Sequence, residues 1–108
     1  MSEITVAKPV EKTVHTPAVD VFEGPESFLL RADLPGVGTG QVGLEVDKGE
    51  LKLSAGPESA TWTFERSFAL PDTVDVEAVQ AKLEHGVLEV TLPKRSEARP
   101  RQIKVHVS

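Results

Sequence analysis

The residues with the clearest capacity for acid–base or metal chemistry at neutral pH are three histidines, His15, His85 and His106. Glu84 directly precedes His85, so this pair could be drawn as a base with its orienting carboxylate. Neighbouring residues of a hairpin point apart, however, and Glu84-His85-Gly86 lies where an Asn-Gly turn would fit, because His tolerates a positive φ. His15 and His106 lie in flanks that hold no rigid site. We therefore predict that His85 is a turn residue and that the chain has no catalytic site.

Other patterns give no better candidates for chemistry. Asp72 and Asp75 are carboxylates without a partner nucleophile, so we interpret them as solvated loop charges. The glycine-rich run 36–40 lacks the following lysine and the helix that a phosphate-binding loop needs. No spacing fits a metal site, and the chain has no cysteine. The sequence predicts a protein that is not an enzyme and that uses no cofactor or metal.

The composition narrows the remaining classes of protein. A chain of 108 residues, 39% of them hydrophobic, forms one small domain with a modest core. Its formal charge of −5 argues against a general nucleic-acid binder, and it lacks the run of roughly 18 apolar residues that spans a membrane. Residues 1–10 carry no apolar stretch typical of a signal peptide, and a cysteine-free chain suits a reducing compartment. We expect a cytoplasmic protein without nucleic-acid or membrane partners.

Strands must position whatever surface the protein uses. Val, Ile and Thr account for 25 of the 108 residues, and Gly and Pro interrupt the chain at short intervals, which favours an all-β fold. The sequence predicts an antiparallel β-sandwich with strands at 18–23, 28–34, 41–47, 50–55, 61–70, 79–84 and 87–92. In segment 72–80 the sequence predicts a helical turn with Asp72 or Asp75 as its cap. We divide the chain into a flexible arm (1–16), a sandwich (17–93) and a C-terminal extension (94–108).

Turn residues separate the predicted strands. Pro35-Gly36 ends one strand with a fixed φ followed by a residue that tolerates positive φ, and Asp47-Lys48-Gly49 resembles a three-residue hairpin loop.

Arg66 interrupts an otherwise apolar face. Alternation directs every second side chain of a strand to the core, and Arg66 shares its face with Phe64 and Phe68. It either extends outward along the margin of a sheet or forms an ion pair across a sheet or a subunit interface. The candidate partners are Asp33, Asp47 and Glu50. The other predicted inward sets are Phe28, Leu30, Ala32 and Leu34; Val42, Leu44 and Val46; Trp62 and Leu70; and Leu88, Val90 and Leu92.

A short segment near the C-terminus has the pattern of a strand-addition ligand. In extended backbone Ile103 and Val105 project the same way, from a basic stretch that follows the sandwich. An ordinary last strand of the chain's own sheet is the alternative. Ile4-Thr5-Val6 repeats the spacing near the other terminus, as expected by chance in a valine-rich chain.

Several of these stretches, in this order, resemble the small heat-shock proteins of bacterial type, which are built on the α-crystallin domain. The opening strands are 17–23 and 28–37, and the strand with the family's arginine is 64–71, which places that arginine at Arg66. The glycine-valine-leucine signature spans 81–93 and includes His85, Gly86, Val87 and Leu88. Ile103-Lys104-Val105 is similar to the tail motif, so the resemblance covers roughly residues 17–105.

The resemblance implies an immunoglobulin-like sandwich of seven to eight strands and an ATP-independent holdase, which binds unfolding client proteins and limits their aggregation. It also implies that the tail motif, Ile103 and Val105, inserts into a groove at the sandwich edge of a neighbouring subunit. Carried over to this chain, the groove is lined by Val42, Leu44, Val46, Val79, Ala81 and Leu83.

This sequence departs from the family in two places. The link between the strands ending at Ala55 and starting near Thr61 has five residues, which span about 17 Å and cannot cross to a partner and return. The arm of about 16 residues has no aromatic residue. We expect self-association through the tail rather than through the family's exchanged-strand dimer. The alternative is a monomeric co-chaperone or adaptor similar to the CS-domain proteins, which share the sandwich and also lack an exchanged strand.

Overall fold

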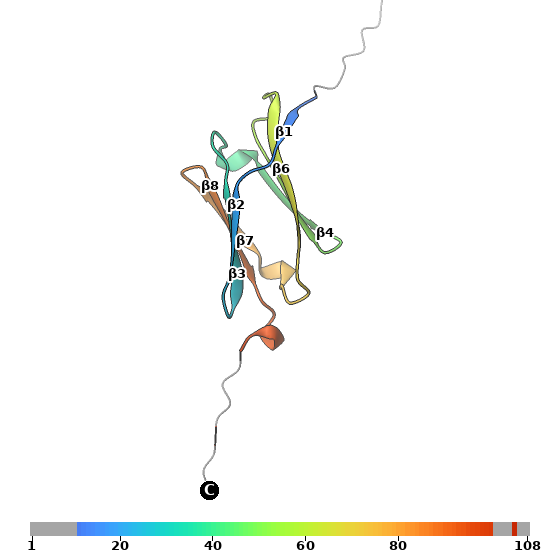
Figure 1. Ribbon diagram of the computed structural model, residues 1–108, viewed down its shortest axis with the longest axis vertical. Helices are drawn as coiled ribbons and strands as arrows, with labels where there is room; N and C mark the ends of the chain where they lie inside the picture. Colours follow the sequence, from blue (N-terminus) through green and yellow to red (C-terminus); the bar gives the residue numbers. More distant parts are fainter. Residues whose placement is uncertain (1–10, 101–104, 106–108) are drawn as a thin grey trace, which may run out of the picture.

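The computed structural model describes residues 11–100 and residue 105, and these residues form an all-β sandwich (Figure 1). Three 3-10 turns, η1 (Thr39–Gln41), η2 (Val76–Ala78) and η3 (Ser96–Ala98), lie between or after the strands. In this described part of the chain, no helix is long and apolar enough to cross a membrane. The eight strands are β1 (Thr13–His15), β2 (Val19–Glu23), β3 (Ser27–Asp33), β4 (Val42–Asp47), β5 (Glu50–Ala55), β6 (Trp62–Ala69), β7 (Gln80–Glu84) and β8 (Val87–Pro93).

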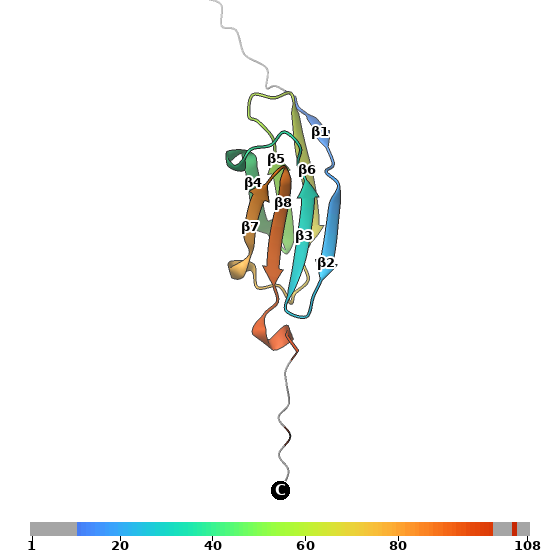
Figure 2. The same cartoon turned by 90° about the vertical axis from the view of Figure 1, so that its left-hand side faces the viewer.

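The strands form two four-stranded sheets. Sheet A has the order β1-β6-β5-β4, and sheet B has the order β2-β3-β8-β7. All neighbours are antiparallel except β1 and β6, which are parallel. Figure 2 shows the sheets stacked face to face, with the edge strands β4 and β7 along one side of the sandwich and β1 and β2 along the other.

The core lies between the central strands of the two sheets. Alternate residues of β3, β5 and β8 are almost fully buried, as the period of two requires for a sheet with one covered face. Aromatic residues of β6 and aliphatic residues of β4 pack against this cluster and are half-buried. The buried set is Leu30, Ala32, Leu34, Val37, Leu51, Leu53, Ala55, Val74, Leu88, Val90 and Leu92.

The alternation of the sequence therefore predicted the fold correctly. Each of the seven expected strands is present, with bounds that differ by no more than one residue. The expected helical turn is η2, where the Asp75 carboxylate accepts a hydrogen bond from the backbone N–H of Glu77 at 3.2 Å.

Two hairpins close with two-residue turns of positive φ. His85 and Gly86 have φ values of 53° and 76°, which confirms His85 as a turn residue. Lys48 and Gly49 have φ values of 50° and 77°, and Asp47 pairs with Glu50. The expected three-residue loop at 47–49 is thus wrong, because Lys48 also adopts the left-handed conformation and shortens the turn by one residue.

Strand β1 was not expected, and it lies inside the segment interpreted as an arm. It pairs with β6 from Thr13 opposite Trp62 to His15 opposite Phe64, and all three of its residues are exposed. Backbone pairing to an edge strand, rather than apolar burial, holds it there. The Lys12 Nζ also donates to the Pro57 carbonyl oxygen at 3.1 Å. Three exposed residues offer no alternation of hydrophobicity, so the sequence gives no signal for this strand.

Arg66 secures the place where the chain crosses from sheet A to sheet B. Its Nη1 donates to the carbonyl oxygen of buried Pro17, between β1 and β2, at 3.3 Å. Its guanidinium carbon lies 5.0 Å from the centre of the Phe68 ring. None of the ion pairs found within residues 11–100 includes Arg66, so the expected partners Asp33, Asp47 and Glu50 are not its partners in this chain. A backbone carbonyl and an aromatic face take the place of a carboxylate.

Replacing Arg66 with alanine should lower the free energy of unfolding by about 1–2 kcal/mol, because it removes a charge-assisted hydrogen bond and a cation–π contact. The matched control is Arg31→Ala, whose side chain is 52% exposed, lies 3.8 Å from Glu89 and makes only a longer ring contact, 6.0 Å from the centre of Phe22. That change should cost less than about 0.5 kcal/mol. Urea denaturation at one fixed protein concentration measures both, and equal losses would contradict the role given to Arg66.

Candidate functional site

The candidate site is a groove along one side of the sandwich, between the edge strands β4 and β7. Neither strand has a neighbour on its outer edge within the described residues, so unpaired backbone groups line both sides of the gap. The groove measures about 200 Å³ and its walls come from both sheets. Its lining residues are Thr39, Val42, Leu44, Ala81, Lys82, Leu83 and Leu88.

The strand register explains why the groove is apolar. Val42 and Leu44 are the inward residues of β4, opposite the buried Ala55 and Leu53 of β5. Leu83 of β7 pairs with Leu88 of β8, which is 2% exposed and forms the floor. At an edge, inward side chains lack the cover of a further strand, so they remain partly open to solvent.

Polar groups stand only at the rim of the groove. Lys82 alternates with Ala81 and Leu83, so its side chain points to the outer face of sheet B, where its Nζ lies 3.5 Å from Glu84. Thr39 comes from η1, just before β4. The walls are hydrocarbon and the flanking backbone can still form hydrogen bonds, which is the arrangement that accepts an extended segment with aliphatic side chains.

The structure brings together four of the six residues that the resemblance assigned to the groove, namely Val42, Leu44, Ala81 and Leu83. Val46 lies farther along β4 and is 39% exposed, and Val79 precedes β7 and packs against the core. Neither lines this cavity. Sequence reasoning missed Thr39 and Lys82, which belong to a short turn and to the outward face. It did not place Leu88 in the groove, although its alternation with Val90 showed that it points inward.

The two residues of the tail motif are not both visible in the structure. Ile103 lies outside the described residues, and Val105 is 81% exposed. The start of the extension, by contrast, contacts sheet B.

Lys94 anchors the extension where it leaves β8. Its side chain is 12% exposed, and its Nζ lies 2.8 Å from Glu23 Oε2 and 4.9 Å from the centre of the Phe28 ring. The Arg99 Nε donates to the Lys94 carbonyl oxygen at 2.9 Å across η3. These contacts join the extension to the β2–β3 hairpin and hold residues 94–99 at the end of β8. We call this set of contacts the tail anchor.

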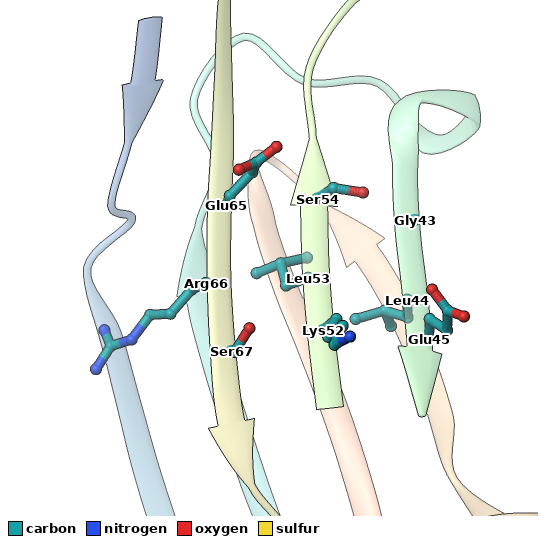
Figure 3. A pocket seen from close by; sticks show the side chains of 9 residues that line it. All are labelled: Gly43, Leu44, Glu45, Lys52, Leu53, Ser54, Glu65, Arg66 and Ser67. Carbon is teal, nitrogen blue, oxygen red and sulfur yellow. The ribbon is translucent and has the colours of Figure 1, made fainter. Parts of the chain in front are cut away.

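The outer face of sheet A carries a wider but polar hollow of about 620 Å³ (Figure 3). Small residues at Gly43 and Ser54 form its floor, and Glu45, Lys52 and Glu65 stand around it. The Arg66 side chain points away from it, toward the chain between β1 and β2 (Figure 3). Within the described residues no group of three or more His, Asp or Glu side chains could hold a metal ion. The two serines that line this hollow, Ser54 and Ser67, have no histidine beside them in its lining.

Comparison with known proteins agrees with the fold. Residues 20–108 match the Hsp20/alpha crystallin family model. A 17.4 kDa class I heat shock protein of Arabidopsis thaliana is 36% identical over 105 residues, which cover 83% of this chain and 67% of that protein. Spore protein SP21 of Stigmatella aurantiaca is 34% identical, over 82% of this chain and 61% of its own length.

Solved structures of small heat-shock proteins have the same sandwich. One from Xylella fastidiosa superposes with a TM-score of 0.67 at 36% identity, over 84% of this chain and 96% of that chain. The hspA of Xanthomonas axonopodis gives 0.66 at 37% identity, over 75% and 95%. With the sandwich and these relatives in agreement, the chain belongs to the Hsp20/alpha crystallin family of small heat-shock proteins, which are chaperones.

Proposed function

We propose that this protein is an ATP-independent holdase of the cytoplasm, which binds extended apolar segments of unfolding proteins and limits their aggregation. The observation that carries the proposal is the β4–β7 groove, where aliphatic walls lie beside two strand edges that have no partner within residues 11–100. An unfolding chain exposes both aliphatic side chains and unpaired backbone groups. The groove can bury the first and form hydrogen bonds with the second.

The energetics fit reversible capture. Two aliphatic side chains buried in the groove contribute on the order of 3–5 kcal/mol before the cost of ordering the segment. A single contact of this size is weak, so a client can leave without an energy source. The glycine-rich run 36–40 leads only into the three-residue η1, which gives no helix N-terminus to hold a nucleotide phosphate.

We further propose that copies of the chain associate through Ile103 and Val105, which enter the groove of a second copy. Leu88, at the floor of the groove, lies five residues before the end of β8, or about 17 Å away. The tail anchor holds residues 94–99 at that end. The four steps from Arg99 to Ile103 reach about 14 Å at most, which is short of Leu88 at the far end of the chain's own groove.

The link between β5 and β6 supports association without strand exchange. Ala55 pairs in register with Phe64, and the connection 56–61 contains no strand. The two strands thus form a local hairpin. We propose that the tail, and not an exchanged strand, is the contact on which assembly depends.

Replacing Ile103 and Val105 with alanine should lower the native mass at a given concentration, because the aliphatic side chains that fill the groove are gone. Light scattering over a concentration series measures the mass, and circular dichroism checks that strand content is unchanged. Lys104→Ala is the matched control, since its side chain points away from the other two in extended backbone. An unchanged mass for the double variant would exclude the tail as an intersubunit link.

The unsubstituted chain at stoichiometric concentration should delay the aggregation of a heated client without any nucleotide. Ala81→Arg should weaken this protection several-fold, because a guanidinium in the mouth of an apolar groove loses hydration without gaining a partner. Gln80→Arg places the same charge on the outer face of β7, opposite Thr91, and should protect like the unsubstituted chain. Light scattering from the heated client follows its aggregation. Failure of the unsubstituted chain to delay aggregation would overturn the holdase proposal.

A further inference from the structure

The outer face of sheet B carries a row of charged residues that crosses all four strands. Asp20 of β2 pairs with Arg31 of β3, Arg31 with Glu89 of β8, and Glu89 with Lys82 of β7. Their neighbours along β3 and β8 are buried in the core, so the four charged side chains point outward. From β2 to β7 the row reads negative, positive, negative, positive. Figure 2 shows the four strands side by side, with no other described segment across this face.

Ion pairing within the sheet uses only part of this row. Arg31 Nε lies 3.8 Å from Glu89 Oε2, and both side chains are partly exposed. The Lys82 ammonium instead lies 3.5 Å from Glu84, on its own strand, and Asp20 belongs to none of the ion pairs found within residues 11–100. Exposed pairs of this kind contribute little to the stability of a fold. The row therefore remains able to meet charges on another surface.

The row is complementary to itself. A two-fold axis that runs parallel to the strands, in front of the sheet, reverses the order of the strands and keeps each row at its own level. Asp20 then faces Lys82 of a second copy, and Arg31 faces its Glu89, so all four contacts join opposite charges. An axis along the row would instead place each charge over its own counterpart. The charges thus favour one of the two orientations.

The same axis places an exposed aromatic ring over a hollow. Phe22 of β2 is 51% exposed, and its row ends at Gln80 of β7. A hollow of about 270 Å³ lies at that end of the row, lined by Gln80, Ala81, Lys82, Glu89 and Thr91. The ring of each copy therefore lies over the hollow of the other.

We propose that two copies of this chain pack the outer faces of sheet B against each other, about a two-fold axis parallel to the strands. The same patch serves both copies, so the contact closes as a dimer. The two Phe22 rings supply apolar burial, and the charged row fixes the orientation. The contact uses neither Ile103 nor Val105, and each dimer keeps two open grooves. It is thus independent of the holdase proposal and of assembly through the tail.

Reversing one charge of the row tests the complementarity. The chain with Ile103→Ala and Val105→Ala serves as background, so that tail contacts do not contribute. Adding Arg31→Glu should raise the dissociation constant of the dimer about tenfold, because two of the four contacts become like-charged. Further addition of Glu89→Arg restores opposite charges and should restore the affinity to within about twofold. Lys52→Glu, on the outer face of sheet A, changes the net charge equally and should have no effect.

Sedimentation equilibrium measures these constants, and circular dichroism checks that each variant keeps its strand content. Equal effects of Arg31→Glu and Lys52→Glu would contradict the proposal, since they would reflect net charge alone. Failure of Glu89→Arg to restore the affinity would contradict it too. A background chain that stays monomeric at its highest soluble concentration would overturn it outright.

Removing the ring tests the hollow. In the same background, Phe22→Ala should weaken the dimer about tenfold, as expected for an aromatic anchor in a pocket. Val14→Ala is the matched control, because Val14 is 54% exposed but lies on β1 of the other sheet. It should leave the dissociation constant unchanged. Equal losses for the two variants would contradict the placement of the ring.

Crosslinking tests the orientation, since the chain has no cysteine of its own. Ala18 and Glu84 lie at the two ends of the row that contains Asp33, so the proposed axis places each over the other's counterpart. Two copies of either position lie three strand spacings apart, or about 14 Å to the side. Mixing Ala18→Cys chains with Glu84→Cys chains and a short bis-maleimide should give mainly mixed dimers. Equal amounts of mixed and like dimers would overturn the proposed orientation.

Discussion

The pairing of β3 with β8 is the interaction on which the rest of the structure depends. It joins Ser27 to Pro93 and Asp33 to Val87 in one unbroken antiparallel ladder, between segments that are far apart in the sequence. The same ladder places Leu30, Ala32, Leu88 and Val90 side by side at the centre of the core. The hairpins β2–β3 and β7–β8 each share one strand with it, so sheet B is complete once the ladder forms. Long-range pairing of this kind closes a large loop before it gains contacts, which makes it the slow part of folding.

The sequence contained most of this fold because one rule, alternation, accounts for most of the burial. β3, β5 and β8 each present apolar residues at every second position, and positive-φ residues such as Gly49 and Gly86 mark the turns between strands. The rule fails where burial does not hold an element. β1 is an exposed three-residue strand held by backbone pairing, and η3 follows the last predicted strand in a polar stretch. Neither leaves a pattern in the residue types.

The sequence predicted most residues of the groove walls, but not every contact that the structure shows. Val42, Leu44, Ala81 and Leu83 belong to two segments that alternation identified, although their meeting across the sandwich came from resemblance and is visible only in three dimensions. The partner of Arg66 could not be predicted from the sequence either. A carboxylate was the natural expectation for an inward guanidinium, but the Pro17 carbonyl oxygen meets it instead, and a backbone acceptor has no signature in sequence.

The tail anchor has a geometric consequence for any assembly built through the tail. Lys94 fixes the exit of the extension at one end of β8, whereas Leu88 at the floor of the groove lies near the other. A contact from exit to groove joins two different surfaces, so it is heterologous, and each added copy is turned by the same angle relative to the last. Such a series closes into a ring when that angle divides a full turn and otherwise grows as an open helix. In an assembly of this kind, the hydrogen-bonded stretch around Lys94 and Arg99 would determine the direction in which the tail leaves each copy, although it touches neither the groove nor the proposed tail motif.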